Sequence, residues 1–118
     1  MNKGCIVAIL DDLQMSVHLA KISTTYAYEL NFCDKISQIS YKSSPTAIII
    51  DLNSTSEEDL QKIVASTQNH NITIMGYCQE LNSPLLNYFK EMGCEVVFKR
   101  YELMKNLGQI LSNLFNAS

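Results

Sequence analysis

Near its N-terminus the chain reads Cys5-Ile6-Val7-Ala8-Ile9-Leu10-Asp11-Asp12, six apolar residues followed by two aspartates. A continuous apolar run of this length is typical of a strand that is buried on both faces of a sheet. A second such run, Thr46-Ala47-Ile48-Ile49-Ile50, ends at Asp51. Two separate buried strands are therefore predicted to end at carboxylates.

Weaker strand patterns occur at 28–33, 71–77 and 95–98, and helical patterns lie between and after the strands, over 13–27, 34–41, 55–67, 83–92 and 103–115. This alternation predicts an α/β fold with a parallel sheet and helices on both faces. We expect a doubly wound, five-stranded sheet of order 2-1-3-4-5 in a single domain over 1–118 that stands alone, with no output domain.

The helical pattern over 13–27 carries two apolar stripes. The stripe predicted to face the core comprises Leu13, Val17, Ala20, Thr24 and Ala27. The other comprises Met15, Leu19, Ile22 and Tyr26. Whether this second stripe is a partner surface or part of a wide core face stays open.

Two later helices have recognisable N-terminal signals. Thr55 and Glu58 have the spacing of a capping box, which predicts a helix start near Thr55. Ser83 precedes Pro84, a combination that suits an N-cap followed by the first helical residue. The helix over 34–41 is predicted to be broken by Ser43-Ser44-Pro45.

The composition excludes several classes of protein. The chain has 118 residues, 47% of them hydrophobic, and a net charge of −3. With a single arginine and no basic run, it is a poor candidate for binding nucleic acid or a membrane surface. Four widely spaced cysteines and the lack of a signal peptide lead us to expect reduced thiols and a cytoplasmic protein.

Three carboxylates are predicted to converge at one edge of the sheet. If the strands that end at Asp11-Asp12 and at Asp51 are neighbours, their carboxyl ends meet at that edge. Like charges at close range repel unless a cation joins them, and Mg²⁺ is the divalent ion best suited to oxygen ligands. The alternative is that these acids only end strands or cap helices, as Asp12 can for the helix that follows it.

Three segments together resemble the receiver domain of two-component response regulators, a flavodoxin-like fold: 7–12 with its acidic pair, 48–52 with its single aspartate, and 93–100. The resemblance implies that Asp51 accepts a phosphoryl group from a histidine kinase or phosphotransfer protein. It also implies that Asp11, Asp12, Asp51 and the backbone carbonyl of Asn53 hold Mg²⁺. Signalling would proceed through a downstream protein, and a homodimer is a further expectation.

The chain departs from the receiver pattern where that family carries its switch. Tyr77, between Gly76 and Cys78, stands at or beside the position of a small hydroxyl residue. It is expected either to report on conformation or to fill the space left by Gly76. Arg100 stands where the family has a lysine that supports the phosphate, with Lys99 a less favoured candidate. Tyr101 replaces the proline that follows.

Two functions remain open on these residues. In the first, the chain is a working receiver whose activity is limited to self-catalysed phosphotransfer and dephosphorylation. In the second, it is a pseudo-receiver, a protein-interaction module that does not depend on phosphorylation. No GxGxxG or Walker A motif occurs, so no nucleotide is expected as a cofactor. A flavin is not expected either, because Asp11 and Asp12 after the first strand would repel its phosphate unless a metal intervened.

Overall fold

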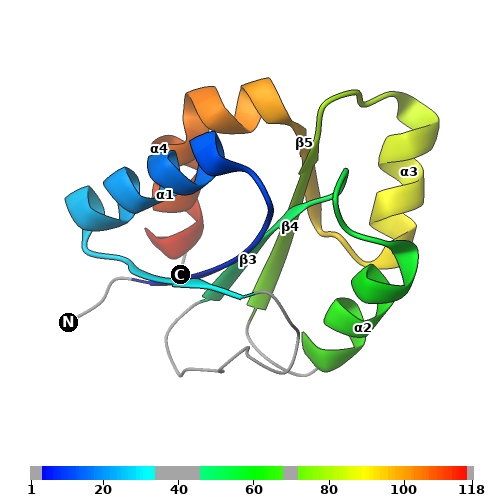
Figure 1. Ribbon diagram of the computed structural model, residues 1–118, viewed down its shortest axis with the longest axis horizontal. Helices are drawn as coiled ribbons and strands as arrows, with labels where there is room; N and C mark the ends of the chain where they lie inside the picture. The colour runs from blue at the N-terminus through cyan, green and yellow to red at the C-terminus, as the bar shows by residue number, and fades with distance from the viewer. Residues whose placement is uncertain (1–3, 34–45, 68–71, 117–118) are drawn as a thin grey trace.

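The computed structural model describes residues 4–33, 46–67 and 72–116. They form a five-stranded parallel sheet of order β2-β1-β3-β4-β5, which confirms the predicted fold class (Figure 1). The strands are β1 Cys5–Ile9, β2 Glu29–Phe32, β3 Thr46–Asp51, β4 Ile72–Cys78 and β5 Val96–Lys99. The helices are α1 Leu13–Tyr26, α2 Glu57–Thr67, α3 Ser83–Met92 and α4 Arg100–Asn116. The helix predicted over 34–41, and its break at Ser43-Ser44-Pro45, lie outside the described residues.

The helices cover the two faces of the sheet in pairs. On one face, α1 and α4 enclose a core that includes Ile6, Met15 and Leu107 (Figure 1). On the other face, α2 and α3 enclose a core that includes Ile48 and Leu60. The central strand β3 is buried along its whole length, which explains why its sequence is continuously apolar rather than alternating. The edge strand β2 is half-buried to exposed.

Helix α1 turns its second stripe to the core, so the predicted orientation of this helix was wrong. Met15 and Leu19 are fully buried, whereas Leu13 is 81% exposed and Val17 is 48% exposed. The physical reason is apolar area. The stripe with Met15, Leu19 and Ile22 removes more hydrocarbon from water than the stripe that ends in Thr24 and Ala27.

The helix caps are shifted by one residue from the predicted positions. The Oγ of Ser56, not that of Thr55, accepts a hydrogen bond from the Asp59 amide at 3.1 Å at the start of α2. At α3, Asn82 is the N-cap, because its Oδ1 accepts a hydrogen bond from the Leu85 amide at 2.9 Å. Serine, threonine and asparagine cap helices almost equally well, so neighbouring candidates cannot be separated by residue type.

Two further features complete the description of the fold. Gly93 ends α3 with a φ of 119°, a left-handed conformation that favours glycine. The four cysteines are buried thiols. Among the described helices, none is both long and apolar enough to cross a membrane.

Candidate functional site at the carboxyl edge of the sheet

The strand register brings four sequence-predicted residues to the same edge of the sheet. Asp51, the last residue of β3, is the register partner of Tyr77, and Tyr77 is the partner of Phe98 in β5. Arg100 follows β5 directly as the first residue of α4, and Asp12 lies just before α1. The carboxyl ends of β1, β3, β4 and β5 therefore form one polar cluster.

Arg100 and Asp12 form a bidentate ion pair at the centre of this cluster. The Nε of Arg100 donates to Oδ2 of Asp12 at 2.8 Å, and its Nη2 donates to Oδ1 at 3.1 Å. The side chains are only 21% and 13% exposed, respectively. Because the guanidinium stabilises the charged carboxylate, it lowers the pKa of Asp12 from 3.8 to about 2.

Tyr77 supplies a third hydrogen bond to the same carboxylate. Its side chain is 1% exposed, and its hydroxyl donates to Oδ2 of Asp12 at 3.0 Å. Burial, with the nearby carboxylate of Asp51, raises the pKa of Tyr77 far above its ordinary value. The phenol is therefore neutral at any physiological pH and stays a donor.

The interpretation that Tyr77 fills the space left by Gly76 was wrong. Successive residues of a strand point to opposite faces of the sheet. Tyr77 packs with the α1–α4 core, whereas Leu52 occupies the side toward which Gly76 faces. A Cβ built on Gly76 would lie 2.6 Å from Cδ1 of Leu52, so this position has no room for a larger residue.

Asp12 is also the N-cap of α1, as the alternative interpretation of this acid predicted. Its backbone is extended, and its Oδ1 accepts a hydrogen bond from the Met15 amide at 3.1 Å. Gln14, the second residue of α1, accepts a hydrogen bond from Nη2 of Arg100 at 3.0 Å. Sequence reasoning missed Gln14, and its place in the first turn after the acidic pair was the available signal.

Asp51 is held in a turn built largely by its own neighbours. It is 8% exposed, and its Oδ1 accepts a hydrogen bond from the Asn53 amide at 3.0 Å. The Oγ1 of Thr55 donates to the Asp51 carbonyl at 2.8 Å. The side-chain oxygen of Asn53 accepts a hydrogen bond from the Gln79 amide at 2.8 Å, which ties this turn to the end of β4.

The remaining predicted site residues lie around the cluster. Lys99 is exposed at the end of β5. Cys78 is buried, donates from Sγ to the Glu80 carbonyl at 3.2 Å, and has a pKa raised by burial. Tyr101 is 71% exposed, with Nζ of Lys105 at 5.9 Å from its ring centre.

As arranged here, the acids do not fit a magnesium ion. Both carboxylate oxygens of Asp12 are already engaged by Arg100, Tyr77 and the helix amide. Asp11 is exposed. Within residues 4–33, 46–67 and 72–116, no group of three or more acids, histidines or cysteines is placed to hold a metal. The magnesium site stays a prediction that requires Arg100 to leave Asp12.

Comparison with known proteins supports the fold and goes no further. No protein-family model matches the chain, and no curated protein matches it significantly. A pilus assembly-related protein from Burkholderia pseudomallei K96243 aligns over 95% of this chain and 88% of its own, with a TM-score of 0.68 and 16% identity. The regulatory domain of the master biofilm regulator CsgD aligns over 98% and 89%, with a TM-score of 0.68 and 14% identity. The chain thus has a divergent receiver-like fold.

Proposed function

We propose that this receiver-like domain is a signalling module that acts by associating with another protein, and that the association does not depend on phosphorylation of Asp51. The observation that carries the proposal is the ion pair between Arg100 and Asp12. In a working receiver, Asp12 would hold a metal and Arg100 would support the phosphate. Here each satisfies the charge of the other, so neither is available for those roles.

The surrounding contacts favour a single state of the site. Arg100 donates three hydrogen bonds, two to Asp12 and one to Gln14. Hydrogen bonds between charged groups contribute about 1.5–3 kcal/mol each, with the lower figure suited to a partly exposed pair. Tyr77 is already buried and hydrogen-bonded to Asp12, so its side chain has no exposed position from which to move inward. Phosphorylation of Asp51 would have to break these hydrogen bonds before it could change the conformation of the site.

The experiment that tests this proposal is incubation with acetyl phosphate and MgCl₂, followed by intact mass measurement. We expect no acid-labile phosphoryl adduct on the wild-type protein, and a melting temperature that does not change between MgCl₂ and EDTA. The matched control is Asp51→Asn, which cannot form an acyl phosphate. An adduct on the wild type that is absent from Asp51→Asn would show that the Arg100–Asp12 pair does not prevent the reaction, which removes the observation that carries the proposal.

A working receiver is the second candidate, and the position of Asp51 favours it. The carboxylate lies at the carboxyl end of the central strand, and its Oδ1 is fixed by the Asn53 amide. In this candidate a carboxylate oxygen attacks phosphorus and the bond to the leaving group breaks. With acetyl phosphate this is the P–O bond to acetate, and with a phosphorylated kinase histidine it is the P–N bond to the imidazole ring; the leaving atom keeps the electron pair. Arg100 would first have to leave Asp12. Arg100→Ala would then change the lifetime of the adduct, and an unchanged lifetime would count against this role.

A further inference from the structure

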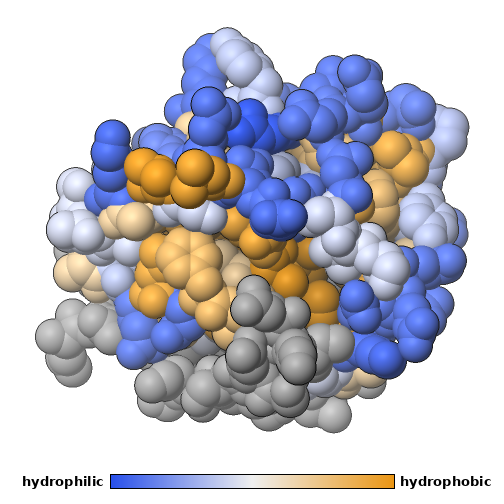
Figure 2. Space-filling model, in the orientation of Figure 1, coloured by the Kyte–Doolittle hydropathy of each residue, from blue (hydrophilic) through white to orange (hydrophobic). Residues whose placement is uncertain are grey.

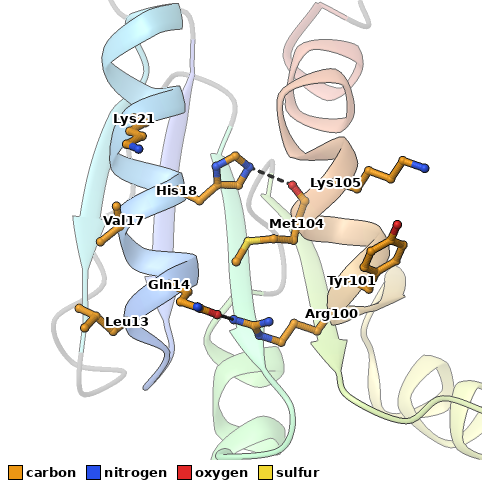
Figure 3. A pocket seen from close by; sticks show the side chains of 9 residues that line it. All are labelled: Leu13, Gln14, Val17, His18, Lys21, Arg100, Tyr101, Met104 and Lys105. Carbon is orange, nitrogen blue, oxygen red and sulfur yellow. Dashed lines mark hydrogen bonds between the residues drawn. The ribbon is translucent and has the colours of Figure 1, made fainter.

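An apolar groove lies between α1 and α4, on the face of α1 that the core does not use. It has a volume of about 670 Å³, and its apolar lining comes from Leu13, Val17, Tyr101 and Met104 (Figure 3). Leu13, Val17 and Tyr101 are among the most exposed large hydrophobic residues of the described chain. Figure 2 shows apolar surface over the α1 side of the molecule, among hydrophilic residues. Exposed apolar surface of this kind is typical of an interaction site.

Two polar contacts fix the distance between the helices that form the groove. A ring nitrogen of His18 on α1 donates to the Met104 carbonyl on α4 at 2.9 Å (Figure 3). At the other end, Gln14 accepts the hydrogen bond from Arg100, which is itself fixed on Asp12. Arg100 therefore occupies the carboxylate of Asp12 in the candidate site and also fixes one end of the groove through Gln14. A partner can bind without a change in the spacing of the two helices.

The charge of the groove has the opposite sign to that of the chain. The chain carries a net charge of −3, yet the groove is lined by Lys21, Arg100 and Lys105 with no acidic side chain among its lining residues. Lys21 and Lys105 are exposed and come from opposite walls (Figure 3). Since Arg100 is already paired with Asp12, the two lysines supply the cations that a partner would meet.

We infer that this groove binds an amphipathic helix of another protein, with apolar residues facing Leu13, Val17 and Tyr101 and with aspartate or glutamate facing Lys21 and Lys105. This inference rests on the proposed function and names the kind of partner that it requires. A groove between two helices accepts a third helix through residues spaced three and four apart.

A second copy of the chain is a poorer occupant than such a partner. The most acidic of the described helices is α2, with Glu57, Glu58 and Asp59 in its first turn. Its apolar residues Leu60 and Ile63 are 2% and 1% exposed, because they pack in its own core. Within the described residues, this helix therefore cannot offer acidic and apolar side chains together.

The test uses a fluorescent synthetic helix with leucine at positions i, i+3, i+4 and i+7 and glutamate on both flanks. The control peptide has the same leucines and lysine on the flanks. By fluorescence anisotropy with the full chain, we expect the glutamate peptide to bind at least about tenfold more tightly. Val17→Glu, and Lys21→Glu combined with Lys105→Glu, should each lose about that factor, whereas Lys90→Glu, on exposed α3 surface, should not.

Three results would overturn the inference. The first two are equal binding of both peptides and no binding of either. The third is a homodimer of the chain, seen by sedimentation, that dissociates in Val17→Glu. Repeating the titration after acetyl phosphate and MgCl₂ separates the two proposals. If the glutamate peptide binds only the form phosphorylated on Asp51, the groove stands and the proposed function fails. If it binds neither form, the groove fails, and intact mass alone decides the proposed function.

Discussion

Arg100 and Asp12, 88 residues apart in the sequence, share two hydrogen bonds of 2.8 and 3.1 Å. The pair joins the residue that starts α4 to the residue that caps α1. Tyr77 adds the end of β4 to the same carboxylate. A single acid thus ties three elements together at the carboxyl edge of the sheet.

Removing the guanidinium should destabilise the protein measurably. Arg100→Ala leaves Asp12 with the tyrosine hydroxyl and one amide as partners, so we expect a loss of about 1–3 kcal/mol in the free energy of unfolding. Urea denaturation measures this loss. The control is Lys62→Ala, which removes a 3.1 Å pair with Glu58 whose side chains are 59% and 77% exposed, and should cost under about 0.5 kcal/mol. Equal losses in the two variants would contradict a structural role for Arg100.

Removing only the hydroxyl of Tyr77 should have a smaller, separable effect. Tyr77→Phe keeps the buried ring and deletes the 3.0 Å hydrogen bond to Asp12, so the expected cost is about 1 kcal/mol. Because the hydroxyl and the guanidinium share Oδ2 of Asp12, the double variant with Arg100→Ala should not show the sum of the two losses. Strict additivity in urea denaturation would show that the two side chains act independently.

The lowered pKa of Asp12 predicts a specific loss of stability in acid. Its folded pKa of about 2 lies below the ordinary 3.8, so the folded state holds fewer protons and gains stability above that ordinary value. The gain, about 1–2 kcal/mol after allowance for partial exposure, is lost as the pH falls from about 4 to about 2.

Asp12→Asn tests this assignment, because an amide does not titrate. Stability curves of the wild type and the variant, measured by thermal unfolding across that pH window, should converge as the pH falls. Curves that stay parallel through the window would show that other carboxylates cause the acid sensitivity.

Position 76 should require glycine because the side chain of Leu52 leaves no room for a Cβ, and not because of its backbone conformation. The Cβ of Gly76→Ala would lie 2.6 Å from Cδ1 and 2.8 Å from Cγ of Leu52, so side chain or strand must shift, at a cost of about 1–3 kcal/mol. Shortening the neighbour with Leu52→Val should recover part of that cost. Chemical denaturation of the two single variants and the double variant measures the coupling, and purely additive losses would exclude the contact as the cause.

The sequence was sufficient to predict the sheet, because its central strands are long apolar runs that end in acids. The strand order was expected from the doubly wound, receiver-like fold rather than from the runs themselves, and both this order and the position of Asp51 at the carboxyl edge are confirmed. The partners of Asp12 were not predictable in the same way. A sequence indicates which residues reach an edge, whereas the rotamers of Arg100 and Tyr77 decide whether the acid receives a guanidinium or stays open to a metal.

The choice between the two stripes of α1 also exceeded what periodicity can decide. Both stripes have helical spacing, and only packing against the sheet selects the one with Met15 and Leu19. The same ambiguity hid the groove, since Leu13 and Val17 were assigned to the core and not to the surface.

The orientation of α1 can be tested by comparing one residue from each stripe. Leu19 is fully buried, so Leu19→Ala should cost about 2–5 kcal/mol through lost burial and the cavity left behind. Val17 is 48% exposed, so Val17→Ser should change stability by under about 0.5 kcal/mol. Val17 and Leu19 are two residues apart on one helix, so helix propensity affects both variants modestly and burial dominates the difference. Denaturant titration of the two variants measures it. A large loss from Val17→Ser, with a small one from Leu19→Ala, would return the first stripe to the core and remove the apolar wall on which the groove depends.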